Sequence, residues 1–169
     1  MQNIELKVRV KDFKTIEKDL KKIGAKYQGV LKQKDTYYNC AKGRLKIREI
    51  NNKKFELIFY QRPDKAINKL CDFLVVPIKK QELKQIKNLF ALAMGVKVIV
   101  SKNRKLWLYK NTRVHLDNVD GLGKFLELET VLEKISQFVG QKEYTGIFDI
   151  LKLDRFAKIK RSYSDLLLK

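Results

Sequence analysis

Cysteine and histidine are scarce in this chain, which contains two cysteines and one histidine among 169 residues. Cys40 and Cys71 lie far apart and form no CxxC pair, so the pattern argues against a structural zinc site. Without an export signal, we expect both to be free thiols in a reducing cytoplasm.

Long apolar runs and linker segments are also missing. No stretch approaches the roughly 20 apolar residues that a membrane-spanning helix needs, and the N-terminus lacks the apolar core of a signal peptide. Only two prolines are present, and no Pro-, Gly- or Ser-rich linker divides the chain. We therefore expect a cytoplasmic protein without a membrane partner, in which residues 1–169 form one domain.

Acidic residues are few in relation to basic ones. The chain has 38 Lys and Arg against 19 Asp and Glu, which is a formal net charge of +19. Such an excess predicts a polyanionic partner, and nucleic acid, anionic lipid and a polyphosphate small molecule all qualify. The positions of the charges must decide among these partners.

Alternation of polar and apolar residues predicts about eight strands. In residues 2–10, Ile4, Leu6 and Val8 face one way, whereas Glu5 and Lys7 face the other. The other strand-like runs are 27–38, 42–50, 54–62, 70–77, 97–110, 112–118 and 124–132. Helices are expected at 12–23, 80–94 and 136–152.

The polar faces of these strands are dense in charge, with little Ser, Thr or Gln. The three helices need an apolar surface, and the apolar faces of the strands supply it, so the charged faces are turned inward. Eight strands is about the number that closes a barrel. The sequence thus predicts an α+β fold, a closed eight-stranded antiparallel β-barrel with helices packed outside.

The expected interior holds more cations than carboxylates. The cations are Lys7, Arg9, Arg44, Lys46, Arg48, Arg62, Lys102, Arg104 and Arg113. The carboxylates are Glu5, Glu56, Asp117, Glu127 and Glu129. Interior charges are costly unless they are paired or liganded, so this excess predicts a bound polyanion. Clustered carboxylates predict a hard divalent cation with oxygen ligands, Mg²⁺ or Mn²⁺.

Five segments, in order along nearly the whole chain, resemble the CYTH, or triphosphate-tunnel metalloenzyme, superfamily. Asn3–Lys7 resembles its ExExK signature, Gln33–Tyr38 its QxDTYF segment and Leu45–Arg48 its LRxR strand. Val114–Glu129 resembles its LDxVxxLGxFxEIE block. The ending Ser162–Leu167 is similar to the SYSDLL of the class IV adenylate cyclase-like branch.

The resemblance implies an eight-stranded tunnel that grips a triphosphate. It implies metal ligands at Glu5, Asp117, Glu127 and Glu129. It implies phosphate ligands at Lys7, Arg44, Lys46, Arg48, Lys102, Arg104 and Arg113, to which the charged-face pattern adds Arg9 and Arg62. The chain departs from the family at Asn3, where a carboxylate is usual, and at Gln61-Arg62-Pro63, where many members have Lys-Gly-Pro.

Three single residues invite further roles. Lys7 is the candidate catalytic group, as a phosphate contact or a base, and the alternative is an ion pair with Glu5. His115 borders the site, and we assign it no chemistry. Asp165 either caps a helix or pairs with an Arg of the tunnel.

Two reactions of a bound triphosphate fit these residues. A class IV adenylate cyclase-like enzyme converts ATP to cyclic AMP and pyrophosphate, and a triphosphatase hydrolyses inorganic tripolyphosphate, thiamine triphosphate or a nucleoside triphosphate. A non-catalytic binder of polyanions or nucleic acid is a third class, and the carboxylates Glu127 and Glu129 beside cations argue against it. The resemblance is also consistent with a homodimer.

Overall fold

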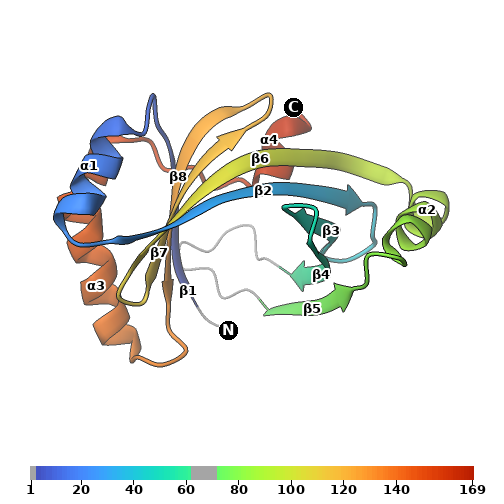
Figure 1. Ribbon diagram of the computed structural model, residues 1–169, viewed down its shortest axis with the longest axis horizontal. Coiled ribbons are helices and arrows are strands. Elements are labelled where there is room, and N and C mark those ends of the chain that lie inside the picture. The colour runs from blue at the N-terminus through green and yellow to red at the C-terminus, as the bar shows by residue number, and fades with distance from the viewer. Residues whose placement is uncertain (1–2, 62–71) are drawn as a thin grey trace.

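The computed structural model describes residues 3–61 and 72–169, which build one eight-stranded sheet flanked by helices (Figure 1). The strands are β1 (Asn3–Arg9), β2 (Lys26–Tyr38), β3 (Arg44–Ile50), β4 (Lys54–Gln61), β5 (Asp72–Ile78), β6 (Val96–Tyr109), β7 (Thr112–Val119) and β8 (Gly123–Val131). The helices are α1 (Lys14–Lys22), α2 (Leu83–Met94), α3 (Gln137–Ile150), the short 3-10 helix η1 (Leu153–Arg155) and α4 (Tyr163–Leu167).

All neighbouring strands are antiparallel, in the order β1-β8-β7-β6-β2-β3-β4-β5. This confirms the predicted α+β fold with eight antiparallel strands. The sheet curls strongly, so that β3, β4 and β5 come round beneath β2 and β6 (Figure 1). Within the described residues the hydrogen-bonded order starts at β1 and ends at β5, and closure of the barrel between those two strands stays a prediction.

The outer edge of β1 is partly covered by the segment that leads to α4. Ile159 donates its backbone N–H to the carbonyl oxygen of Lys7 at 2.8 Å, and Lys158 forms an antiparallel bridge with Val8. Lys7 and Val8, the two residues of β1 that make these contacts, lie in the C-terminal half of the strand. The C-terminal segment is thereby tied to the strand that carries Glu5 and Lys7.

Local sequence explains how the elements start and stop. Asn51 and Asn52 both have positive φ at the two central positions of the turn between β3 and β4, which the N–H of Lys53 closes by donating to the carbonyl oxygen of Ile50 at 3.0 Å. Gly24, also at positive φ, ends α1 in a Schellman motif, in which Ala25 donates to the carbonyl oxygen of Leu20. Asp12 lies just before α1, where its side chain accepts a hydrogen bond from the N–H of Lys14.

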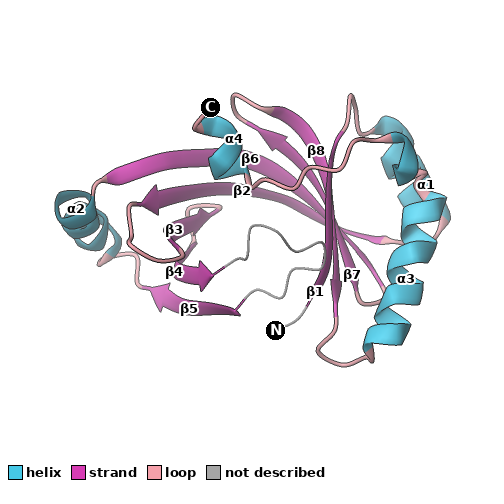
Figure 2. Ribbon diagram, turned by 180° about the vertical axis from the view of Figure 1, so that it is seen from behind, coloured by secondary structure: helices cyan, strands magenta, loops and turns pink. Residues whose placement is uncertain are grey.

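Helices α1 and α3 cover the outer face of β1, β6, β7 and β8 (Figure 2). Their apolar residues join those of the strands in one core, in which Leu20, Leu126 and Ile147 are almost fully buried. Trp107 belongs to this core, on the face opposite to the charged residues of β6. None of the helices in residues 3–61 and 72–169 combines the length and apolarity needed to cross a lipid bilayer.

Helix α2 covers the outer face of the other half of the sheet. Its residues Leu83, Ile86 and Phe90 pack against Tyr38 and Ile47. All three long helices therefore lie outside the curl, as the sequence predicts. The charged residues of the strands alternate with these apolar ones and face inward.

Helix α4 is different, because it packs on the inner face. Tyr163 is 7% exposed and joins Tyr37, Val100, Val119 and Phe125 in a small inner cluster at one end of the sheet. This end is where β2 stops and β6 begins. Helix α4 thus covers one end of the charged inner face.

Candidate functional site

Two groups of buried ion pairs lie on the inner face. One spans β2 and β3 around Asp35, and the other spans β6, β7, β8 and β1 around Asp117 and Glu127. The antiparallel register creates them, because it sets Asp35 opposite Arg48 and Asp117 opposite Arg104. Residues that face each other across strands have Cβ atoms about 5 Å apart, within reach of a salt bridge.

Asp35 holds two predicted phosphate ligands in place. Its carboxylate accepts from Lys46 Nζ at 2.7 Å and from Arg48 Nε and Nη2 at 2.8 Å each. Burial alone would raise the pKa of Asp35, but the charges of Lys46 and Arg48 hold that pKa far below its ordinary value. Asp35 therefore stays ionised and fixes both cations toward the interior.

Asp117 is the most enclosed group of the site and is fully buried. It accepts from Lys102 Nζ at 2.9 Å, from Arg104 Nε at 2.7 Å and from the Tyr163 hydroxyl at 3.0 Å. Burial opposes its ionisation, but Arg104 and Lys102 lower the pKa of Asp117 to about 2. Burial and the neighbouring Arg104 lower the pKa of Lys102 to about 8.

Glu127 lies on β8, between Lys7 of β1 and His115 of β7. Its carboxylate pairs with Lys7 Nζ at 3.0 Å and forms a very short contact with Arg104. Burial would raise the pKa of Glu127, but the charge of Lys7, followed by that of Arg104, keeps it well below the ordinary value. His115 Nδ1 lies 3.9 Å from the same carboxylate, and burial lowers the pKa of His115 well below 6.5, so this imidazole is neutral.

The end of the inner face farthest from α4 carries a different arrangement. Glu129 lies directly opposite Glu5 of β1 on one side and Arg113 of β7 on the other. Asn3 donates its side-chain N–H to Glu129 at 2.6 Å, and Arg113 Nη1 lies 3.4 Å from the other carboxylate oxygen. Two carboxylates are thus set face to face, a position that favours a bridging cation.

Helix α4 contacts cations from several strands. The Tyr163 ring lies 4.1 Å below Lys7 Nζ and 5.0 Å below Lys102 Nζ, measured to the ring centroid. Asp165 pairs with Arg44 at 2.9 Å and also completes a capping box with Ser162. Both roles suggested for Asp165 by the sequence are therefore filled at once.

The described structure brings most of the predicted site residues to one face. Those on it are Glu5, Lys7, Arg44, Lys46, Arg48, Lys102, Arg104, Arg113, Asp117, Glu127 and Glu129. Arg9 lies at the rim, where it donates to the carbonyl oxygen of Leu122 at 2.7 Å. Glu56 pairs with Lys54 at 2.6 Å. Arg62 lies outside the described residues. The roles assigned to these residues stay predictions.

Two residues that sequence reasoning did not place in the site, Asp35 and Tyr163, belong to this face. Asp35 lies opposite Arg48 and on the same side of β2 as Tyr37, which the alternation of the sequence could have indicated. Tyr163 reaches the face only because α4 folds back over it, and no local pattern predicts that contact.

The fit of a divalent cation differs along the face. The oxygens of Asp117 and Glu127 are already engaged by cations, and the described residues contain no preformed group of three or more acidic, His or Cys side chains for a metal. At the other end, Glu129 and Glu5 face each other, and the buried carbonyl oxygen of Asn3 has no hydrogen-bond partner. Hard oxygen donors of this kind suit Mg²⁺ or Mn²⁺.

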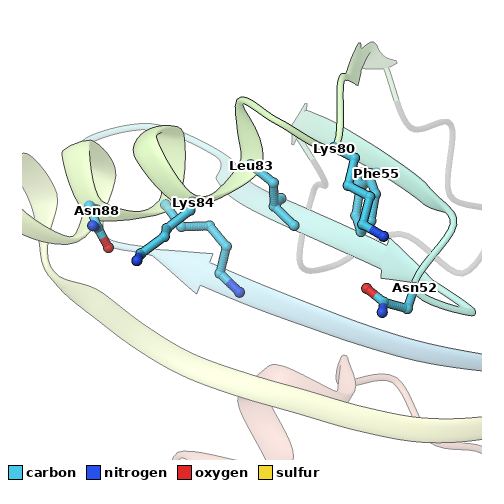
Figure 3. A pocket seen from close by; sticks show the side chains of 7 residues that line it. Asn52, Phe55, Lys80, Leu83, Lys84 and Asn88 are labelled. Carbon is cyan, nitrogen blue, oxygen red and sulfur yellow. The ribbon is translucent and has the colours of Figure 1, made fainter.

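A separate pocket of about 280 Å³ lies outside the curl, between α2 and the turn that joins β3 to β4 (Figure 3). Lys80, Lys84 and Asn52 line it, together with the apolar Leu83 and Phe55. None of the predicted site residues within 3–61 and 72–169 lines this pocket. The charged inner face is therefore the better candidate.

Comparison with known proteins decides the family. Residues 1–163 match the CYTH domain. The chain belongs to the CYTH family. Members of this family mostly handle triphosphates and are generally metal-dependent. The predicted family is thus confirmed.

Relatives of this CYTH chain match it end to end. "Putative adenylate cyclase MJ0240" of Methanocaldococcus jannaschii is 29% identical, over 98% of each chain. The structure of the PH1012 protein from Pyrococcus horikoshii OT3 superposes with a TM-score of 0.81 at 24% identity, over 97% of this chain and 98% of that one. A structure titled as a putative adenylate cyclase from Vibrio parahaemolyticus has a TM-score of 0.74 at 18% identity, over 100% and 99%. These two structures support the fold.

Proposed function

We propose that this CYTH chain is a divalent-metal-dependent enzyme that cleaves a triphosphate bound on its inner face. The observation that supports it best is the array of buried cations held by Asp35, Asp117 and Glu127. Each carboxylate orients a pair of basic side chains before any ligand arrives. Preorganised charge of this kind stabilises the transition state of phosphoryl chemistry without reorganisation.

The two groups of cations would bind different phosphate groups of the triphosphate. Lys46 and Arg48 approach from β3, whereas Lys102 and Arg104 approach from β6. Burial and the charge of Arg104 both oppose the rise in the pKa of Arg48 that Asp35 causes, so the positive charge of Arg104 repels that of Arg48. A polyanion between them would relieve this repulsion. Lys7, the candidate catalytic group, reaches the same space from β1.

A divalent cation would bind at the end marked by Glu129 and Glu5. Bound there, Mg²⁺ or Mn²⁺ would polarise the phosphoryl oxygens and offset their charge. The roles of this chain's own residues are separate from that chemistry. Glu129 and Glu5 supply the negative charge, and Arg113 binds beside them from β7.

Cyclisation is the reaction we favour, with ATP giving cyclic AMP and pyrophosphate. The ending Ser162–Leu167 and the block Val114–Glu129 resemble the class IV adenylate cyclase-like branch, and the relative from M. jannaschii bears a cyclase name. The triphosphatase is the second candidate. Asn3 removes one negative charge from the metal end, and hydrolysis needs only a water near the terminal phosphorus.

Product analysis separates the two reactions. The protein is incubated with ATP and Mn²⁺, and the products are resolved by chromatography. Cyclic AMP with pyrophosphate supports the cyclase. ADP with orthophosphate, or faster cleavage of inorganic tripolyphosphate than of any nucleotide, overturns it in favour of the triphosphatase. No cleavage of any triphosphate with either metal overturns the enzyme proposal itself.

A matched pair of variants tests the metal-binding end. Glu129→Ala should abolish metal-dependent turnover and keep the fold, because it removes a carboxylate from a cation-rich face. Glu133→Ala is the control, since Glu133 is exposed just beyond the same strand. Turnover that survives Glu129→Ala, or that persists fully in chelator, contradicts the metal assignment. A single domain, a homodimer and a cytoplasmic location stay predictions.

A further inference from the structure

Asn3 occupies a position on the inner face with one buried atom left unsatisfied. Its side-chain N–H₂ donates to Glu129 Oε1 at 2.6 Å, across 126 residues of sequence. Its carbonyl oxygen Oδ1 is buried and has no hydrogen-bond partner. A buried amide oxygen without a hydrogen-bond partner destabilises the fold, so such an atom calls for an explanation.

The orientation of this amide is fixed by chemistry. Turning it over would place Oδ1 against the carboxylate of Glu129, two acceptors without a proton between them. The N–H₂ group must therefore face Glu129 while Glu129 is ionised. Oδ1 is left on the same face as Glu5 and Glu129, because Asn3 and Glu5 share the inward parity of β1.

We propose that Asn3 Oδ1 is a neutral oxygen ligand for the divalent cation at this end of the face, beside Glu129 and Glu5. The inference rests on the metal dependence in the proposed function. Amide carbonyl oxygens are ordinary ligands of hard cations. A cation here would satisfy the orphan oxygen and also relieve the repulsion between the two facing carboxylates.

The neutral ligand has a consequence for how the metal binds. A site with two carboxylates and an amide has one negative charge fewer than a site with three carboxylates, and affinity depends on the charge of the ligands. The cation is then held weakly by the protein alone and more strongly when phosphate oxygens complete its shell. The ligand that the site takes is accordingly a complex of metal and triphosphate.

Binding of Mn²⁺, measured by the EPR signal of the free ion, tests this without turnover. The titration is made with the full chain, alone and with inorganic tripolyphosphate. Asn3→Ala should weaken binding about tenfold. Asn3→Asp should tighten binding of Mn²⁺ alone, because it adds charge to the ligand set. Asn118→Ala, an exposed asparagine of β7, should leave binding unchanged.

The opposite sign for Asn3→Asp overturns the inference. If Asn3 only orients Glu129 through its N–H₂ group, the aspartate loses that hydrogen bond and repels Glu129. Binding then falls in both Asn3→Asp and Asn3→Ala.

Direct ligation is separated from a through-space effect by Asn3→Cys. Soft thiolate favours Cd²⁺ over Mn²⁺, so a ligand at position 3 should raise the ratio of Cd²⁺ to Mn²⁺ affinity above that of both the wild type and Asn3→Ala. An unchanged ratio overturns the inference. If the wild type binds no Mn²⁺ with or without tripolyphosphate, the metal dependence of the proposed function fails. If the wild type binds Mn²⁺ and the Asn3 variants bind it equally well, this inference fails and the proposed function is not affected.

Discussion

Asp35 shows how one buried carboxylate organises the inner face. It is 4% exposed, and its two partners Lys46 and Arg48 come from the neighbouring strand. Lys46 is itself 6% exposed, so loss of Asp35 would leave a buried ammonium group without its counter-charge. Removing one partner of a buried pair is far costlier than removing a pair exposed to water.

Asp35→Asn should therefore lower the free energy of unfolding by about 3–5 kcal/mol. Urea denaturation followed by circular dichroism measures it. Glu17→Gln is the matched control, since Glu17 pairs with Lys105 at 2.7 Å on the outer surface and is partly exposed. That variant should change stability by less than about 1 kcal/mol. Equal losses in the two variants would show that the buried group has no special structural role.

Helix α3 offers a test at the scale of one element, because it contains two glycines in different surroundings. A Cβ added to Gly146 would meet no atom within 4 Å. A Cβ added to Gly140 would clash with Leu132 Cδ2 and would also approach Ile135 and Thr130. Gly140 is therefore the close contact of α3 with the end of β8, whereas Gly146 only weakens the helix.

Gly146→Ala should raise the free energy of unfolding by about 1 kcal/mol, through better helix propensity and a less flexible unfolded chain. Gly140→Ala should lower it by about 1 kcal/mol, because Leu132 must move. Thermal or urea denaturation of both variants measures the two signs. Stabilisation of equal size in both would contradict the close packing of α3 on β8.

At the scale of the whole molecule, the charge of +19 is unevenly placed. The inner face of the described strands sets nine basic side chains, counting Lys54, against six acidic ones, counting Glu56, and Asp165 of α4 adds a further carboxylate. The described part of this face therefore has a small positive excess, and most of the charge of +19 lies elsewhere in the chain. Because ionised carboxylates lie at the centre of a cationic protein, its stability should depend on pH.

Stability should fall as the pH drops from about 4 to 2. The pKa of Asp117 is about 2 in the folded chain against 3.8 ordinarily, so the unfolded chain binds more protons in this window. Asp117 alone then accounts for about 2 kcal/mol that is present above pH 4 and lost below pH 2. Asp35 and Glu127, whose pKa values are also lowered, act in the same direction.

Urea midpoints measured at pH 5, 4 and 3 check this dependence. The midpoint should decrease at each step toward acid, because the carboxylate of Asp117 takes up a proton in the unfolded chain at a higher pH than in the folded chain, where Lys102 and Arg104 keep it ionised. A midpoint that stays constant or rises between pH 5 and 3 would show that these carboxylates are not ionised partners in the folded chain.

The sequence by itself determined the elements and the facing of their side chains. Alternation in β1 and β3, the Asn51-Asn52 turn and Gly24 after α1 all act between residues close in the chain, so local patterns reveal them. The family motifs likewise selected a charged inner face. The alternation along a strand, however, assigns a residue to one face of the sheet and does not determine which residue of another strand it will contact.

Only the tertiary structure decided which charges meet. Asp35 belongs with Lys46 and Arg48, and Tyr163 reaches Asp117 because α4 folds back over the inner face. The contact between Asn3 and Glu129 joins residues that are 126 positions apart in the sequence. Such pairings depend on strand order and register, which are set by the packing of the whole sheet rather than by any segment alone.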